Sequence, residues 1–360
     1  MPEALTRPRS DLKVLLLSDG RPGHFNLSEG IVAAMQRLRP VTIARLDVRR
    51  RRRLSGHVAA VAIGMGASPA AVLWLAHGIT PESLPLADAV ISAGAETLPA
   101  NIAAARHFGV PNIFYGSLRS FRSAWFSLVL TSYASQVRTP HPVMTLKPSR
   151  FDPDTLPTRP WTDVGGSPMP PRPAGLLIGG DGGGSRFAAA DWDGLFDMLS
   201  ACHAAWGTRW IVATSRRTPS SIGDRLATLT AQPNSPVQRF IDVRAAGTGT
   251  LTELFAASGM IAVTADSSSM LSEAVWSRRP VLALAPARHV LTPLETAYRQ
   301  QLEATSHCRT LAIAQASPAQ MHAALTTVHP LAHNPLEQLA GLLASRLPDI
   351  LSAATPALPR

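Results

Sequence analysis

The chain has 360 residues, a length that favours two domains, and with 46% hydrophobic and 16% charged residues it does not belong to the disordered class. Its net charge is +10, but the arginines are not interleaved with aromatic residues, which argues against a nucleic acid partner. The only two cysteines, Cys202 and Cys308, exclude a disulfide framework and favour a reduced, cytoplasmic setting.

Short apolar runs alternate with helical stretches along the first half of the chain. This alternation is typical of βαβ units, so the predicted fold class is α/β with mainly parallel sheets. The N-terminal residues MPEALTRPRSDLK have no apolar core, so we predict no signal peptide. The predicted strands are Lys13–Ser18, Val41–Leu46, Val58–Ile63, Ala89–Ser92, Asn112–Tyr115 and Ser127–Leu130. The predicted helices are Ser28–Leu38, Ser68–His77 and Leu98–Phe108.

An arginine run, Arg49–Arg53, precedes a stretch without charged residues, Leu54 to Thr80. The run fits a solvated basic face about as well as attraction to an anionic membrane or a phosphorylated substrate. The uncharged stretch is long enough to span a bilayer, but its glycines and Pro69 favour a buried strand and a helix. We therefore expect a cytoplasmic protein. With the apolar residues around Trp74, Trp125 and Phe126, it could dock peripherally on the inner face of the cytoplasmic membrane.

A proline-rich segment without periodicity, residues 149–173, separates two similar halves. The predicted organisation is a first domain over 1–148, this linker, a second domain over 174–345 and a tail over 346–360. Both domains are expected to be Rossmann-type and to face a cleft. Ligands of such sheets bind beyond the carboxyl ends of the strands, so the loops there should carry the chemistry.

The alternation starts afresh after the linker. The predicted strands are Gly175–Ile178, Arg209–Thr214, Gln238–Val243, Met260–Thr264 and Val281–Leu284. The predicted helices are Ala188–Trp206, Ile222–Leu229, Leu251–Ala257 and Ser269–Ser277, with further helices beyond Thr292.

The segment SDGRPGHFNLSEG, residues 18–30, follows the first predicted strand. Its glycines would let a ligand approach the backbone, and a helix starting near Ser28 would offer free N–H groups to an anion. His24 is a candidate general base, although an ordinary turn with a surface histidine explains the residues slightly better on their own. A second small-residue loop follows the strand at Ala89–Ser92 and contains Gly94, Glu96 and Thr97.

A glycine-rich loop, Gly179-Gly180-Asp181-Gly182-Gly183-Gly184-Ser185, follows the first strand of the second half. Five glycines in six positions are hard to explain as an ordinary turn, because each glycine costs folding entropy. A loop that cradles phosphate or sugar is the favoured interpretation. The loop matches neither of the common ATP and NAD motifs.

Two further loops of the second half are rich in hydroxyls. Ser215, Arg216 and Arg217 follow a strand, where arginines could hold phosphate or simply flank a helix. The other loop leads from a strand into the start of a helix, whose free N–H groups suit a pyrophosphate. A carboxylate one turn into that helix suits the ribose hydroxyls. Helix capping by the serines explains the same residues. Its candidate residues are Asp266, Ser267, Ser268, Ser269 and Glu273.

Together these motifs resemble the "elongated mitochondria" (mitochondrial fission) family. The resemblance rests on Asp19 to His24, Gly179-Gly180, Ser215 to Pro219 and Thr264 to Ala274. Bacterial members of that family are regarded as candidate glycosyltransferases of the GT-B fold. The family motif usually continues after the histidine with three polar residues, whereas this chain has Phe25-Asn26-Leu27.

The chain is more distantly similar to the peptidoglycan N-acetylglucosaminyltransferase that acts on a lipid-linked intermediate. That likeness implies an acceptor-side first domain, with His24 as a candidate base or acceptor-site residue and Glu273 as a candidate ribose ligand. It also implies a donor-binding second domain, with Gly179, Gly180, Asp181, Ser215, Arg216, Arg217, Asp266 and the three serines after it. The remaining acceptor-side candidates are Gly20, Arg21, Gly23, Asn26, Gly94, Glu96 and Thr97.

The resemblance implies transfer of a sugar from a nucleotide-sugar to a cell-envelope glycolipid, such as lipopolysaccharide, or to an oligosaccharide. We expect no metal and no cofactor besides the nucleotide-sugar substrate, because GT-B enzymes generally stabilise the leaving diphosphate with helix dipoles and basic side chains. The alternatives are a nucleotide-sugar epimerase or hydrolase of the same fold, and a non-enzymatic membrane-associated scaffold.

Overall fold

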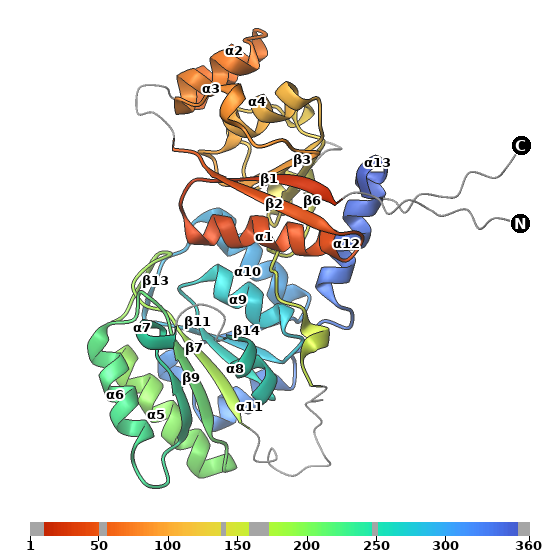
Figure 1. The fold of residues 1–360 in the computed structure, drawn as a ribbon. Coiled ribbons are helices and arrows are strands. Elements are labelled where there is room, and N and C mark those ends of the chain that lie inside the picture. The colour runs from red at the N-terminus through yellow and green to blue at the C-terminus, as the bar shows by residue number, and fades with distance from the viewer. Residues whose placement is uncertain (1–10, 50–55, 138–141, 158–172, 247–250, 352–360) are drawn as a thin grey trace, which may run out of the picture. The chain divides into compact units, whose positions relative to one another are not determined.

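The computed structural model describes residues 11–49, 56–137, 142–157, 173–246 and 251–351 (Figure 1). Residues 50–53 of the arginine run, residues 158–172 of the predicted linker and residues 352–360 of the predicted tail lie outside the described residues. The chain divides into two compact units, which we call unit 1 and unit 2. Unit 1 contains described residues up to Arg150 and again from Pro335 onward, and unit 2 runs from Phe151 to Asn334.

Unit 1 is built on a six-stranded parallel sheet with the order β2-β1-β3-β4-β5-β6. Its central strand β1 is apolar and buried on both faces, as expected for a parallel sheet covered by helices. The strands are β1 (Leu12–Ser18), β2 (Val41–Asp47), β3 (Ala89–Ala93), β4 (Asn112–Tyr115), β5 (Leu128–Thr131) and β6 (Pro142–Met144). The helices are α1 (Pro22–Gln36), α2 (Gly56–Gly64), α3 (Pro69–His77), α4 (Leu98–Phe108), α12 (Pro335–Arg346) and α13 (Pro348–Leu351).

Unit 2 is built on a second six-stranded parallel sheet, with the order β10-β9-β7-β11-β12-β14. The strands are β7 (Ala174–Ile178), β9 (Trp210–Thr214), β10 (Val237–Ile241), β11 (Ile261–Thr264), β12 (Val281–Ala285) and β14 (Arg309–Ala312). A two-stranded ribbon is formed by β8 (Ser185–Arg186) and β13 (Arg288–His289). The helices are α5 (Ala189–Trp206), α6 (Ser220–Thr230), α7 (Val243–Ala246), α8 (Leu251–Ala257), α9 (Ser268–Trp276), α10 (Pro293–Ala304) and α11 (Pro318–Leu325).

Each sheet has one point where the strand order reverses, and the loops there are where ligands of such folds bind. In unit 1 this point lies between β1 and β3, so it brings together the loops that begin at Asp19 and Gly94. In unit 2 it lies between β7 and β11, so it brings together the loops that begin at Gly179 and Ala265. The predicted α/β fold class is therefore confirmed.

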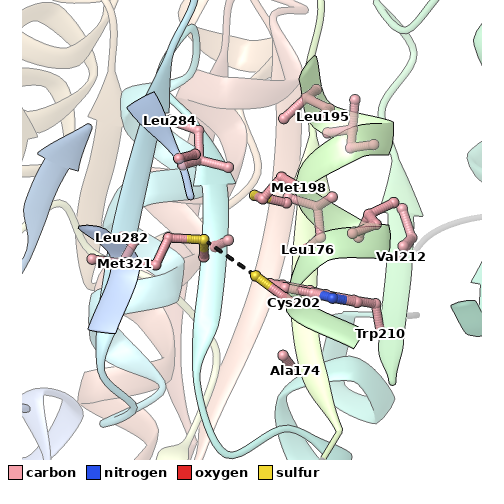
Figure 2. Close-up of a cluster of buried hydrophobic side chains, with 14 of the residues drawn as sticks. Ala174, Leu176, Leu195, Met198, Cys202, Trp210, Val212, Leu282, Leu284 and Met321 are labelled. Atoms are coloured by element: carbon pink, nitrogen blue, oxygen red, sulfur yellow. Dashed lines mark hydrogen bonds between the residues drawn. The ribbon is translucent and has the colours of Figure 1, made fainter. Parts of the chain in front are cut away.

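One hydrophobic cluster of unit 2 lies between the sheet and helices α5 and α11 (Figure 2). Trp210 of β9 is fully buried there, and Cys202 of α5 packs its sulfur 3.7 Å from the sulfur of Met321. Burial raises the pKa of both native thiols, Cys202 and Cys308, to about 12. These cysteines therefore act as small apolar core residues.

Three predicted elements need correction. Val58–Ile63 is not a strand but part of helix α2, whose buried residues Ala59, Ala60 and Ile63 follow a helical spacing. The predicted helix at Ser28 begins six residues earlier, because Pro22 suits the first helical position, where its missing N–H costs nothing. The third is the helical region expected beyond Thr292, which also contains strand β14 at the edge of the second sheet. Strand β6, at the edge of the first sheet, was not predicted either.

The C-terminal helix α12 packs on α1 and therefore belongs to unit 1. Arg37 of α1 pairs with Glu337 of α12, and Arg39 donates a hydrogen bond to the carbonyl of Ile350 at 3.0 Å. The predicted second domain, in contrast, continued to residue 345. Unit 2 thus ends earlier than the predicted second domain, because the local sequence does not reveal that α12 packs on helix α1.

No helix of the described residues combines the length and the apolarity that a bilayer crossing requires.

Two helical glycines of unit 1 should respond in opposite ways to alanine. A Cβ on Gly30 of α1 would lie 2.5 Å from the backbone nitrogen of Ser149, so Gly30→Ala should lower the free energy of unfolding by about 1–3 kcal/mol. A Cβ on Gly341 of α12 would meet no atom within 4 Å, so Gly341→Ala should raise it by about 0.5–1 kcal/mol. Thermal unfolding of both variants by calorimetry measures the difference, and equal effects would contradict this packing.

Candidate functional site

Unit 1 places a histidine and a carboxylate in direct contact at the carboxyl end of β1. His24 Nδ1 lies 2.7 Å from Asp19 Oδ2, and the Asp19 side chain is only 1% exposed, whereas that of His24 is 32% exposed. A carboxylate only accepts hydrogen bonds, so in the neutral imidazole the proton is on Nδ1 and Nε2 has the free lone pair. This pair, the Asp19–His24 dyad, can therefore present Nε2 as a proton acceptor.

The neighbouring β3 loop fixes the position of the dyad. Gly94 has a φ of +92°, and a Cβ there would lie 2.2 Å from His24 Nδ1, so only glycine fits beside the imidazole. Arg21 pairs with Glu96 of the same loop at 3.5 Å, and its backbone N–H donates to Asp19 Oδ1 at 3.1 Å. Four of the predicted residues, His24, Gly94, Arg21 and Glu96, thus gather around one carboxylate.

The other unit 1 candidates have different surroundings. Thr97 is fully buried, and its hydroxyl donates to Ser92 Oγ at 2.8 Å as part of a network that includes Asn101 and Asn112. This network ties α4 to the sheet. Gly20, Gly23 and Asn26 are exposed, and the last two lie on α1 rather than in a loop. The helix N-terminus expected near Ser28 therefore lies at Pro22, beside His24, and the Arg21 N–H at this end donates to Asp19.

Unit 2 gathers its predicted loops around a buried carboxylate, that of Asp266. The side chain of Asp266 is completely buried and accepts hydrogen bonds from the Thr264 hydroxyl at 2.6 Å and the Gly180 N–H at 3.3 Å. Its Oδ2 also lies 2.5 Å from the Arg217 guanidinium. One side chain thus joins the loops after β7, β9 and β11. Burial raises the pKa of Asp266, although these hydrogen bonds and the Arg217 charge act in the opposite direction.

The glycine-rich loop is shaped by close contacts with the protein itself. A Cβ on Gly179 would collide with the Asp266 carboxylate, and one on Gly180 with the Arg217 carbonyl. Gly183 and Gly184 have φ values of +58° and +86°, and Gly182 and Ser185 exchange backbone hydrogen bonds across them, which is the geometry of a tight hairpin turn. The glycines therefore let three loops converge, a reason that the sequence did not reveal.

The loop after β11 leads directly into helix α9. Ser267 caps the helix by accepting a hydrogen bond from the Met270 N–H at 3.3 Å, while Ser269 is exposed on the first turn. Glu273 is half-buried one turn further along. The capping interpretation is thus correct for Ser267, and it leaves the first N–H groups of α9 directed out of the helix end, where an anion is stabilised.

The two adjacent arginines, Arg216 and Arg217, differ in their contacts with the rest of the protein. Arg217 is held by Asp266, and its backbone N–H donates to Ser215 Oγ at 3.2 Å. Arg216 is exposed and has no hydrogen bond or ion pair with the described residues. Asp181 is also exposed, but it accepts a hydrogen bond from the Phe187 N–H at 2.9 Å and so holds the end of the glycine-rich loop.

Sequence reasoning missed several residues that support these loops. Thr218 donates to the Gly179 carbonyl at 2.6 Å, and the buried Arg299 donates to the Ala265 carbonyl at 2.7 Å. Burial lowers the pKa of Arg299. Asp19 and Thr264 belong to the motifs described above and could have been selected as polar residues at strand ends. Arg299 lies on the polar helix α10, where nothing in the sequence distinguishes it from a surface arginine.

The family described as mitochondrial fission ELM1 matches residues 22–339. The chain belongs to this ELM1 family. The match includes His24, the glycine-rich loop, the arginine loop and helix α9, so the predicted resemblance is confirmed. No curated protein sequence matches the chain.

Two bacterial structures are similar to this chain in fold. A Listeria monocytogenes protein described as a candidate UDP-N-acetylglucosamine 2-epimerase is similar with a TM-score of 0.55 and 11% identity, over 94% of this chain and 96% of that one. Staphylococcus aureus MnaA, solved with UDP, gives a TM-score of 0.51 and 10% identity, over 97% of this chain and 100% of that one. These likenesses show the fold, which is of the GT-B type.

The protonation of Asp266 should be visible in the pH dependence of stability. Because burial raises its folded-state pKa, the folded protein binds this proton more tightly than the unfolded chain, so acidification favours the folded state. The free energy of unfolding of the wild type minus that of Asp266→Asn should rise as the pH falls from 7 and level off below about pH 4. Urea unfolding of both proteins across this range measures it. A difference that falls on acidification would contradict the burial argument.

Proposed function

We propose that the protein transfers a sugar from a nucleotide-sugar donor to a hydroxyl of a cell-envelope glycolipid or oligosaccharide. The single observation that carries the proposal is the Asp19–His24 dyad at the switch point of the first sheet. The buried Asp19 carboxylate orients the imidazole, and Nε2 of this partly exposed ring can take the proton of an acceptor hydroxyl as that oxygen attacks the sugar. Family membership and the GT-B fold support the proposal.

The donor would be held by unit 2. The N-terminus of α9 would bind the diphosphate, and Glu273, one turn into that helix, would accept hydrogen bonds from the ribose hydroxyls. Uridine is the first nucleotide to test, because a structure with this fold was solved with UDP. Arg216 rather than Arg217 would neutralise the phosphate charge, since Arg217 is already held by Asp266.

Charge stabilisation of the leaving diphosphate would come from Arg216 and the α9 dipole, so the proposed mechanism needs no metal ion. Proton removal at the acceptor and charge stabilisation at the donor would then be the tasks of different units. Variants of the two sets of residues should therefore affect different kinetic parameters.

A nucleotide-sugar epimerase is the second candidate function, because a structure with a TM-score of 0.55 carries that description. The two functions differ in their products. A transferase releases nucleoside diphosphate only when an acceptor is present, whereas an epimerase interconverts the nucleotide-sugar without one. Incubation of the protein with UDP-N-acetylglucosamine, with and without an envelope glycolipid fraction, distinguishes them by chromatography of the nucleotide products.

The dyad should control turnover and not donor binding. His24→Ala removes the proton acceptor and should lower kcat about 10²–10⁴-fold, while the dissociation constant for the nucleotide-sugar stays unchanged. Asp19→Asn should also lower kcat, because an amide can donate to Nδ1 and thereby favour the wrong tautomer. Steady-state kinetics and calorimetric titration of the same preparations separate the two parameters. Undiminished turnover in His24→Ala would refute the assignment.

Arg216 should contribute to donor affinity. Arg216→Gln should weaken binding of the nucleotide-sugar roughly 10- to 150-fold, because a charge-assisted hydrogen bond contributes about 1.5–3 kcal/mol. Arg225→Gln is the matched control, since Arg225 is a similarly exposed arginine on α6 that pairs with Asp193 at 2.9 Å. Equal weakening in both variants would mean that only the net positive charge matters and would contradict a specific role for Arg216.

A further inference from the structure

Helices α2 and α3 form a hairpin that exposes large apolar side chains. Of the ten exposed large hydrophobic residues in the described part of the chain, five lie here: Val58, Val61, Met65, Trp74 and Leu75. Met65, in the connection between the helices, is the most exposed of the ten at 82%. The concentration in one hairpin is unusual, because exposed apolar residues are normally scattered singly.

The apolar residues of α2 share one face of that helix. Val58 and Val61 of α2 and Met65 just after its end are spaced i, i+3 and i+7, which places them on one side, while Ala59, Ala60 and Ile63 face the core. Helix α3 has a buried side too, with Val72, Leu73 and Ala76. Figure 1 shows α2 and α3 side by side at one end of unit 1, next to α4. The hairpin is thus anchored on one side and apolar on the other.

The hairpin itself has no acidic residue, and the exposed Glu82 lies just after α3. Residues 56–80 contain no Asp, Glu, Lys or Arg, so the hairpin has no carboxylate that an anionic surface would repel. Trp125 lies 3.6 Å from the Cβ position of Gly64 in α2, and the guanidinium of Arg106 lies over the Trp125 ring. Arg122, three residues before Trp125, is exposed as well. An uncharged apolar surface therefore adjoins exposed arginines.

We propose that the α2–α3 hairpin docks unit 1 on a bilayer that contains anionic lipid. The apolar side chains of the hairpin would enter the interface between headgroups and acyl chains, where tryptophan is favoured, and Arg106 and Arg122 would contact the anionic headgroups. A second copy of the chain fits less well, because apposed hairpins would bring the arginines of both copies together. This docking is independent of the proposed sugar transfer.

A fluorescent label on the hairpin tests the proposal in the full chain. Met65→Cys introduces an accessible thiol, which can be labelled selectively because Cys202 and Cys308 are buried. Val290→Cys is the control, since Val290 is 71% exposed and lies in unit 2. An environment-sensitive dye on each thiol is compared with vesicles of phosphatidylcholine alone and of phosphatidylcholine mixed with phosphatidylglycerol, at low and high salt.

The label at position 65 should shift to the blue with the anionic vesicles, with partitioning about tenfold stronger than to phosphatidylcholine alone and weaker at high salt. The label at position 290 should not respond. The proposal is overturned if both labels respond alike, if neither responds, or if the signal at position 65 rises with protein concentration without lipid, which would identify a second copy as the partner.

Unlabelled variants provide a second measurement. Val61→Gln combined with Met65→Gln should reduce cosedimentation with the anionic vesicles about tenfold, whereas Val290→Gln should sediment like the wild type. Both changes are at exposed positions, so thermal unfolding should show intact folds. Undiminished sedimentation of the folded double variant would overturn the proposal.

Discussion

The buried carboxylate of Asp266 is the interaction on which the candidate donor site depends. Taking a carboxylate out of water is costly, and here three donors surround it: the hydroxyl of Thr264 at the end of β11, and the Gly180 N–H and Arg217 guanidinium from two other loops. Because the loops pack so closely on this group, glycine is required at positions where a Cβ would strike Asp266 or Arg217. The ion pair with Asp266 holds Arg217, whereas Arg216 is exposed. The buried carboxylate therefore determines which of the two arginines is available to bind a ligand.

Unit 1 uses the same principle on a smaller scale. The Asp19 carboxylate is buried, His24 and the Arg21 backbone hydrogen-bond to it, and Gly94 provides the space beside the imidazole. In both units the buried acid lies at the carboxyl end of a strand at the switch point of the sheet, Asp19 just after β1 and Asp266 just after β11. The acids orient a base in one unit and a set of loops in the other. Ligand chemistry would then fall to exposed neighbours, His24, Arg216 and the α9 N-terminus.

Most strands and the four loops could be predicted, because short apolar runs that end in glycine or hydroxyl clusters have a clear pattern. Val58–Ile63 was predicted to be a strand, because a run of small apolar residues has no distinct period. Its packing against α3 and α4 makes it helical. The motifs of the candidate site could be identified in the sequence, but the contacts that join them could not. The tertiary fold brings together the residues of the Asp19–His24 contact, of the Asp266 contacts and of the support from Arg299. The glycine-rich loop was attributed to a ligand, but close contacts with the protein's own atoms already explain its glycines.

The central claim is that the loops joined by Asp266 act as one nucleotide site. Hydrogen–deuterium exchange of the wild type, with and without saturating UDP-N-acetylglucosamine, tests it most directly, because peptides covering residues 179–185, 215–218 and 267–273 report each loop separately. Exchange should slow in all three segments together and at the same ligand concentration. Protection of one segment alone, or of none while exchange slows elsewhere in unit 2, would contradict it.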